Sequence, residues 1–326
     1  MSQAGLLGYT RPRTQAALVL LDQVESHLVQ YLLPAAGDGE EVELIDLDSL
    51  DPQLTWQKEF QRAAGDVVRR VYGATTDRDV AEVGKLLARR RALVRRWSTQ
   101  LIGLGLQFRV PERLIPEADY SEELRVKIPR AELIEWDEIH ESLLSKKNEE
   151  VFVRLRDRLA DTVERHEVQH RIDYSRGFTP IPSALAELLG IQNPLDAPEG
   201  GMGARSRDEM SAHLAELTRD DPDVALDILL LSRFLMDRNQ WGTPYHVASL
   251  LIFQEMAREL SIETGGPLVV RGKLQRERVA KLTLALATAP PGQIANAARA
   301  TWAKLYGEPL AAVTTAVRVR RPVWRH

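Results

Sequence analysis

Residues 152–170 read FVRLRDRLADTVERHEVQH and carry the strongest structural signal in the chain. Apolar side chains recur in this stretch at every third or fourth position: Phe152, Leu155, Leu159 and Val163. This spacing places them on one face of an amphipathic helix. When the same face is continued toward the C-terminus, it reaches His166 and then His170. Both histidines are therefore expected on the inward side of a helix.

The five residues from His166 to His170 have the spacing of a zinc site. Histidines four positions apart lie one above the other on a helix, so both imidazoles can reach one metal ion. A Glu directly after the first His points to the side, where it can deprotonate the water that zinc activates. We expect a Zn²⁺ cofactor with His166 and His170 as ligands and Glu167 as the general base.

This segment resembles the active-site helix of the zincin metallopeptidases. The metzincin branch places a Gly and a third ligand just downstream, but residues 171–177 read RIDYSRG and lack that pattern. The chain is closer to the gluzincin branch, in which a Glu on a later helix completes the site. The resemblance covers residues 152–217 and implies a zinc metallopeptidase, a hydrolase that acts on a peptide or protein substrate.

The third ligand is expected on a helix predicted over residues 206–217. The gluzincin resemblance favours Glu209 for this role. Alternatively, Ser206 and Glu209 have the spacing of a helix N-terminal capping box. Glu216 is the second candidate ligand, and His213, which shares a face with Glu209, is either a substitute ligand or a partner that orients one.

Three further residues are candidates for supporting roles. Asp173 can accept the second N–H of a ligand imidazole, or it can form an ordinary ion pair with Arg171 or Arg176. An oxyanion formed during amide hydrolysis needs a hydrogen-bond donor besides the metal. Tyr245 and His246, in the first turn of a helix predicted to start at residue 244, are candidates for this catalytic role, and ordinary packing is the alternative.

The composition excludes several classes of site and partner. The 326 residues include no Cys, so disulfides, thiolate metal sites and cysteine nucleophiles are excluded. A net charge of −4 gives no reason to expect a nucleic-acid partner. No apolar run approaches the roughly 20 residues of a membrane span, and no signal-peptide core is visible. These features favour a cytoplasmic protein.

The patterning along the chain predicts a mainly α (α+β) fold. Helices are expected over residues 12–33, 56–73 and 77–97, and through most of the chain from residue 131. Residues 105–130 alternate apolar and polar side chains between prolines, which predicts a small β-sheet beside the motif helix. Five arginines in the third helix are expected on a solvated face: Arg89, Arg90, Arg91, Arg95 and Arg96.

Three regions are distinguished on these grounds. Residues 1–100 form an N-terminal helical region, residues 101–220 a zincin-like metal-binding core, and residues 221–326 a C-terminal helical region. Asp221-Pro222 and Thr243-Pro244 are each expected to open a helix, and Pro290-Pro291-Gly292 is expected to separate the last two helices.

Two other functions are compatible with the sequence. Glu167-x-x-His170 matches half of the pattern of carboxylate-bridged di-metal helical bundles, and residues 137–140 supply an imperfect second half. The chain could also be a non-enzymatic helical interaction module that holds a structural metal or none. Metal identity and count, and the phenotype of a Glu167 variant, distinguish these alternatives.

Overall fold

The structure is a computed structural model that describes residues 8–10, 17–37, 55–73, 77–102, 113–114, 126–177, 180–194 and 198–311. Within these ranges the fold is mainly helical, with two small antiparallel sheets of two strands each. The mainly α fold class predicted from the sequence is confirmed. No helix among the described residues has both the length and the apolar character needed to cross a bilayer.

The N-terminal part of the described chain contributes a hairpin and a group of helices. Their bounds are β1 Gly8–Tyr9, β2 Leu18–Val19, α1 Leu21–His27, a π-helical turn Leu28–Leu32, α2 Leu33–Ala36, α3 Thr55–Gly73, α4 Asp77–Ile102 and α6 Arg130–Leu143. The helices expected over residues 56–73 and 77–97 are thus confirmed as α3 and α4. The helix expected over residues 12–33 was wrong in its first part, because residues 18–19 pair with β1 as strand β2.

The rest of the described chain consists of further helices and a second small sheet. The bounds are α7 Lys146–Arg176, α8 Ser183–Leu189, α9 Met202–Glu216, α10 Val224–Met236, α11 Pro244–Glu259, β3 Val269–Val270, β4 Lys273–Leu274, α12 Arg276–Thr288 and α13 Pro291–Tyr306. Helix α11 begins at Pro244 as predicted, whereas α10 begins at Val224, two residues after Pro222. Helices α12 and α13 are separated at residues 289–290, as expected. The side chain of Thr243 caps α11 by accepting a hydrogen bond from the backbone N–H of His246 at 3.3 Å.

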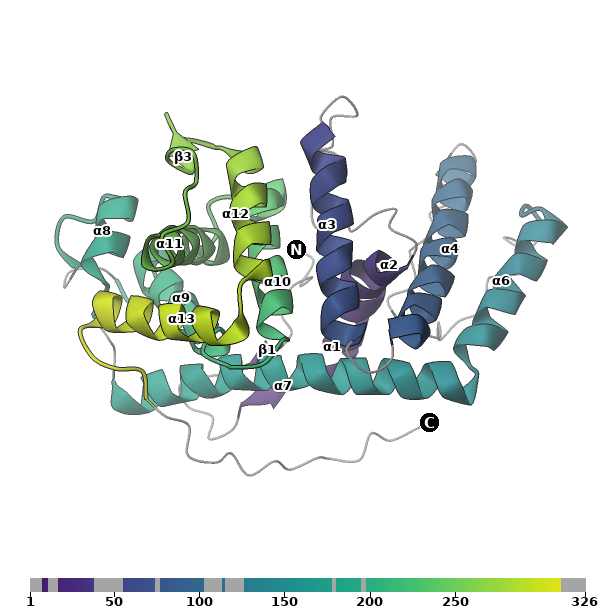
Figure 1. Cartoon of the computed structure of the whole chain (residues 1–326), viewed down its shortest axis with the longest axis horizontal. Helices are drawn as coiled ribbons and strands as arrows, with labels where there is room; N and C mark the ends of the chain where they lie inside the picture. The colour runs from purple at the N-terminus through teal and green to yellow at the C-terminus, as the bar shows by residue number, and fades with distance from the viewer. Residues whose placement is uncertain are drawn as a thin grey trace.

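Helix α7 runs along one edge of the molecule (Figure 1). Its 31 residues span about 46 Å at 1.5 Å per residue. Ser145 caps its first turn by accepting a hydrogen bond from the N–H of Asn148, and Gly177 ends it with a φ of +86°. Helices α3, α4 and α6 stand over the N-terminal half of α7, and α8 to α13 cover its C-terminal half (Figure 1).

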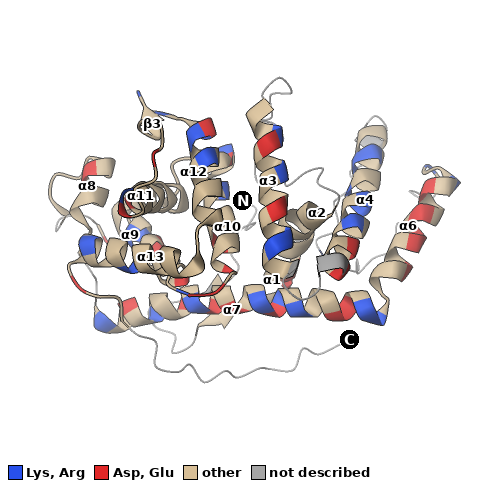
Figure 2. Ribbon diagram, in the orientation of Figure 1, with Lys and Arg blue, Asp and Glu red and all other residues tan. Residues whose placement is uncertain are grey.

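One continuous hydrophobic core joins these two groups of helices. Helix α10 is at its centre, because nearly all of its residues are buried and it contacts α3, α11 and α12. Figure 2 agrees with this placement, since α10 and α11 are mostly uncharged whereas charged residues follow α4, α6 and α7. The core therefore spans residues from all three regions that the sequence distinguished.

The small sheet beside the motif helix has a different origin from the one expected. Most of residues 105–130 lie outside the described residues, and residues 126–128 form a turn. The sheet that contacts α7 is the hairpin β1–β2, paired as Gly8 with Val19 and Tyr9 with Leu18. The N-terminal end of the chain therefore reaches the middle of the fold.

The arginine cluster of α4 was expected on a solvated face, but Arg90 is buried. Its side chain is 2% exposed, and its guanidinium donates hydrogen bonds to the backbone carbonyls of Arg113 and Leu114. Arg89 forms an ion pair with Glu135 of α6. Among the described residues, this part of the cluster links α4 to neighbouring segments of the same chain.

Gly84 allows α4 to approach α2 closely. A Cβ at this position would lie 2.5 Å from the backbone N of Gly37 and 2.6 Å from the carbonyl O of Leu33. Gly84→Ala is expected to lower the free energy of unfolding by about 1–3 kcal/mol, because backbone atoms cannot yield as a flexible side chain can. The helix propensity of Ala offsets about 1 kcal/mol of the strain.

Urea denaturation of the two proteins measures this effect. Gln100→Ala, on the exposed side of the same helix, is the control and should change the free energy by about 0.5 kcal/mol or less. A Gly84→Ala protein as stable as the control would show that α2 and α4 are not in close contact.

Candidate metal centre

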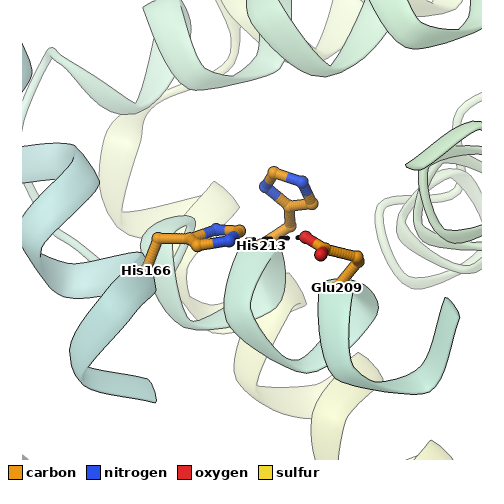
Figure 3. Close-up of side chains that lie close together, drawn as sticks. All are labelled: His166, Glu209 and His213. Carbon is orange, nitrogen blue, oxygen red and sulfur yellow. Dashed lines mark ion pairs between the residues drawn. The ribbon is translucent and has the colours of Figure 1, made fainter. Parts of the chain in front are cut away.

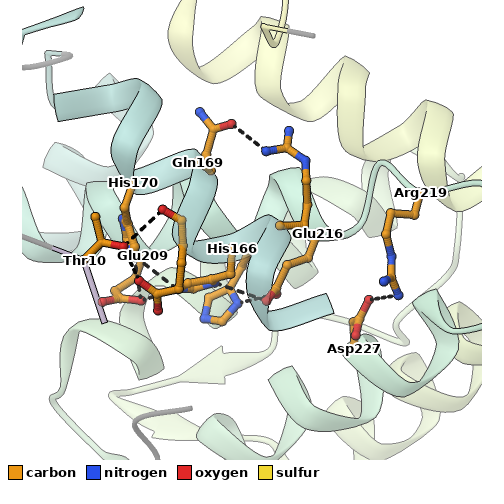
Figure 4. Close-up of polar contacts among 11 residues, drawn as sticks. Thr10, His166, Gln169, His170, Glu209, Glu216, Arg219 and Asp227 are labelled. Carbon is orange, nitrogen blue, oxygen red and sulfur yellow. Dashed lines mark hydrogen bonds and ion pairs between the residues drawn. The ribbon is translucent and has the colours of Figure 1, made fainter. Parts of the chain in front are cut away.

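Helices α7 and α9 pack side by side and bring the proposed ligands together. His166 and His170 project from α7, and Glu209 projects from α9 (Figure 4). His170 is buried, while the side chains of His166 and Glu209 are 11% and 17% exposed. The helix predicted from the apolar stripe thus places both histidines inward, as expected.

The three proposed ligand atoms form a compact triangle. His166 Nε2 lies 3.1 Å from His170 Nε2 and 3.4 Å from Glu209 Oε2, and His170 Nε2 lies 3.9 Å from Glu209 Oε2. Two ligands of a tetrahedral zinc ion bound at 2.0–2.1 Å are about 3.4 Å apart. The separations of these atoms are therefore of the size that a tetrahedral metal requires.

Ser206 and Glu209 do not form the capping box that was the alternative for Glu209. The N-cap of α9 is Gly201, so Ser206 lies inside the helix, where it is fully buried. The side chain of Glu209 is therefore free to face the two histidines of α7. The structure leaves its Oε2 without a hydrogen-bond partner among the described residues.

His213 extends the cluster on the same face of α9. A nitrogen of His213, a nitrogen of His166 and a carboxylate oxygen of Glu209 all lie within 4.8 Å of one another (Figure 3). The rings of His166 and His213 are 4.5 Å apart. His213 Nε2 is buried and has no hydrogen-bond partner among the described residues. His213 is therefore placed either to bind a metal or to act on a ligand beside it.

The carboxylate of Glu216 contacts two of these histidines. Its Oε2 lies 2.8 Å from Nδ1 of His213, and its Oε1 lies 3.2 Å from Nδ1 of His166. The contact with His213 is a hydrogen bond in which Nδ1 of the neutral imidazole donates to the carboxylate, so the lone pair on Nε2 is available to a metal. His166 Nδ1 lies at ion-pair distance and forms no hydrogen bond with a described residue. Glu216, the second candidate for third ligand, therefore orients His213 and interacts with His166 through its charge.

The charges of the cluster are strongly coupled. Burial lowers the pKa of His170 to about 4, with the nearby His166 acting in the same direction. Burial opposes protonation of His166 as well, but Glu216 and Glu209 outweigh it and raise its pKa well above the usual value. Burial would raise the pKa of Glu209, yet the neighbouring histidines lower it. Without a metal, the protonated His166 imidazole therefore supplies the positive charge between the carboxylates of Glu209 and Glu216.

The residues of the cluster fit a divalent cation for two physical reasons. Two nitrogen lone pairs cannot face each other at 3.1 Å unless a proton or a metal ion lies between them. Buried polar atoms without partners are also costly. Glu209 Oε2 and His213 Nε2, two atoms that could bind a metal, lack hydrogen-bond partners among the described residues. A donor set of imidazole nitrogens and one carboxylate oxygen suits zinc.

Glu167 points away from this triangle but remains close to it. It is 5% exposed and lines a cavity of ≈ 80 Å³ beside the cluster. Burial raises the pKa of its carboxyl, although His166 and a hydrogen bond from Thr10 oppose that rise. Apolar and polar side chains share the walls of this cavity: Leu159, Val163, Leu230, Phe234, His166, His213, Glu216 and Tyr245. A small ligand in the cavity would thus contact Glu167 and the cluster together.

The two candidate oxyanion donors are placed differently. Tyr245 lines the cavity, and its ring stacks on Phe234 at 5.0 Å between centroids. The Glu209 carboxylate beside it raises the pKa of its hydroxyl, so the hydroxyl stays protonated at neutral pH. His246 faces another way, with Nδ1 3.1 Å from the carbonyl O of Phe234, and it is not among the residues that line the cavity.

Asp173 has neither of the roles considered for it. It accepts hydrogen bonds from Gln169 Nε2 at 2.7 Å and from Ser211 Oγ at 2.5 Å. Burial raises the pKa of its carboxyl to about 6. Asp173 therefore links α7 to α9 through Gln169 and Ser211 and does not orient a ligand imidazole.

The di-metal alternative is not supported by the arrangement of the helices. Its second half would come from His140 of α6, whose Nδ1 lies 2.8 Å from the carbonyl O of Trp136. Helix α6 meets α7 at its first turn, some 20 residues before His166, which is about 30 Å along the helix. The two halves of the pattern are therefore at opposite ends of α7.

Two residues of the site were not anticipated from the sequence. Thr10 donates a hydrogen bond to Glu167 across 157 positions of the chain, and Gly8 lines the same cavity. A short strand of two residues leaves no motif or periodicity in a sequence, so nothing in the pattern indicated this contact.

Comparisons with protein-family models, with curated proteins and with solved structures found no match to this chain. The function proposed below therefore follows from the side chains of the site and their geometry.

The orienting role of Glu216 can be measured through metal affinity. Glu216→Gln is expected to weaken zinc binding by about 10–100-fold, because the amide loses the charge-assisted hydrogen bond from His213 and the negative charge beside His166. Competition with a chromogenic chelator gives the dissociation constant. Glu150→Gln, at an exposed position of α7, is the control. Equal affinity of the two variants would exclude the orienting role.

His27 gives a pH-dependent prediction because it lines the same cavity. Burial, with the charge of Arg233 acting in the same direction, lowers its pKa from 6.5 to about 3. The unfolded chain therefore binds a proton at His27 between these values while the folded chain does not. As pH falls from about 6.5 toward 3, this group should reduce stability by up to about 1.4 kcal/mol per pH unit.

Urea denaturation of the wild type and of His27→Phe at pH 7, 6 and 5 tests this sign. The variant lacks the titrating group, so its stability relative to the wild type should improve as the pH falls. Carboxylates titrate in both proteins and cancel in the comparison. A difference that stays constant with pH would contradict the low pKa of His27.

Proposed function

We propose that this chain is a zinc-dependent metallopeptidase. The observation that carries the proposal is the convergence of His166, His170 and Glu209, whose ligand atoms lie 3.1–3.9 Å apart, with Glu167 beside them. These three residues would hold the metal, and His213, whose nitrogen lies within 4.8 Å of the ligand atoms of His166 and Glu209, is a further candidate ligand. The gluzincin pattern of a two-histidine helix and a Glu on a later helix supports the same assignment.

A bound zinc would polarise the substrate carbonyl and lower the pKa of water at the site to about 7. Glu167 would take a proton from the water while the water oxygen attacks the amide carbon. The carbon–nitrogen bond then breaks, and Glu167 returns the proton to the leaving amine. The products are a carboxylic acid and an amine, and one water is consumed.

Two other side chains would assist this reaction. The hydroxyl of Tyr245 is held protonated beside Glu209, so it can donate a hydrogen bond to the oxyanion. Glu216 orients the imidazole of His213 and interacts with His166 through its charge, as described above. The cavity has a largely apolar wall, which would exclude water from the reacting groups.

Elemental analysis of the purified protein is the first test of the metal. We expect about one zinc per chain, as three protein ligands suffice for a catalytic site. His166→Ala should lose the metal, whereas His140→Ala, which is remote from the site, should retain it. Two iron or manganese ions per chain would favour the di-metal alternative, and no metal after zinc addition would exclude the proposal.

Peptide-library cleavage is the test of the reaction. Glu167→Gln should retain zinc and lower the cleavage rate by about 10²–10⁴-fold, because the amide cannot accept a proton from water. Glu164→Gln, on the same helix outside the cavity, is the matched control and should cleave at the wild-type rate. A Glu167→Gln protein with full activity would remove the general-base assignment and leave the metal as a structural one.

A further inference from the structure

The N-terminal strand lies directly against the proposed general base. Thr10 Oγ1, directly after β1, is 2.6 Å from Oε2 of Glu167 and 3.2 Å from its backbone carbonyl O. At 2.6 Å the hydroxyl donates its one proton to the carboxylate. The two residues are 157 positions apart in the chain.

Gly8 brings the backbone of the same strand onto the other carboxylate oxygen. A Cβ at Gly8 would lie 2.4 Å from Cγ and 2.4 Å from Oε1 of Glu167. Only a residue without a side chain therefore allows the strand to run so close to the helix. Thr10 and Gly8 together hold the two oxygens of one carboxylate from one side.

The strand is itself held in place by the core. Gly8 pairs with Val19 of β2, and the chain passes from β2 directly into α1. In α1 and the turn after it, Val24 and Leu28 are fully buried. The position of Thr10 is thus determined by the packing of the N-terminal helices and not by the hairpin alone.

We infer that Thr10 is a positioning residue for Glu167, and that the N-terminal strand completes the active site. The inference rests on the proposed function. A Glu side chain has three rotatable bonds, and a general base must be held within hydrogen-bond reach of the proton that it takes. The hydroxyl of Thr10 binds Oε2 and limits rotation of the carboxylate, while the Glu167 side chain also lines the cavity.

This role predicts a specific kinetic pattern. Thr10 acts through Glu167 and is not among the residues that line the cavity, so its loss should not change substrate binding. Zinc binding should also be unchanged, because Glu167 is not one of the proposed ligands. The effect should therefore fall on kcat, with KM and metal content retained.

Thr10→Val is the decisive variant, because it removes the hydroxyl and keeps the shape of the side chain. With the zinc-loaded full chain and a peptide from the library screen, we expect kcat to fall by about 10–100-fold at unchanged KM. Thr10→Ser restores a hydroxyl and should recover most of the rate. Thr288→Val, which removes an exposed hydroxyl bonded to the carbonyl O of Leu284, is the control.

Thermal unfolding of the zinc-free protein provides a second readout that needs no substrate. Thr10→Val should lower the Tm by about 2–4 °C in the wild type. It should have no such effect in a Glu167→Leu background, where the acceptor is missing. A similar Tm loss in both backgrounds would show that Thr10 and Glu167 are not bonded, and would overturn the inference.

The outcomes separate this inference from the proposed function. An active wild type with an equally active Thr10→Val protein would overturn the positioning role and leave the peptidase proposal intact. A fall in kcat that Thr10→Ser does not reverse would also overturn it, since shape and not the hydroxyl would then matter. A wild type that holds zinc but cleaves no peptide would contradict both the peptidase proposal and the positioning role of Thr10.

Discussion

The carboxylate of Glu216 is the contact on which the geometry of the site depends. It lies at the end of α9, with one oxygen 2.8 Å from Nδ1 of His213 and the other 3.2 Å from Nδ1 of His166 on α7. One buried group thus ties together the two helices that carry the ligands. The hydrogen bond limits rotation of the His213 ring, whereas His166 lies at ion-pair distance from the same carboxylate. Because the surroundings are buried, water screens these interactions only weakly.

This arrangement has a cost that a bound cation would remove. Glu209 and Glu216 are both charged near one another, and burial alone would favour their neutral forms. The histidines keep them ionised, chiefly through His166, whose pKa is raised well above the usual value. In the absence of metal, the fold therefore holds a proton where zinc would bind. Metal binding and proton release at His166 are linked for this reason.

The site is assembled from segments that are far apart in the sequence. Helix α7 supplies His166, His170 and the proposed general base Glu167, α9 supplies Glu209 and Glu216, and α11 supplies Tyr245. Thr10 contacts Glu167 from 157 positions away. Each segment is anchored in one continuous core, which ties the geometry of the site to the stability of the whole fold. Helix α10, buried in this core, contributes Leu230, Leu231 and Phe234 to the wall of the cavity.

Periodicity and local chemistry in the sequence predicted most of the long helices and one face of the site. The spacing of Phe152, Leu155, Leu159 and Val163 predicted the inward placement of His166 and His170, since both features repeat with the turn of a helix. The hairpin of β1 and β2 escaped prediction because strands of two residues carry no periodicity. The choice between Glu209 and Glu216 was also open, because both lie on the same face of α9. Only tertiary packing decided that Glu209 faces His166 and His170, that Glu216 lies beside His166, and that Thr10 reaches Glu167. These contacts depend on distances between segments, and the sequence of one segment contains no information about how closely another approaches it.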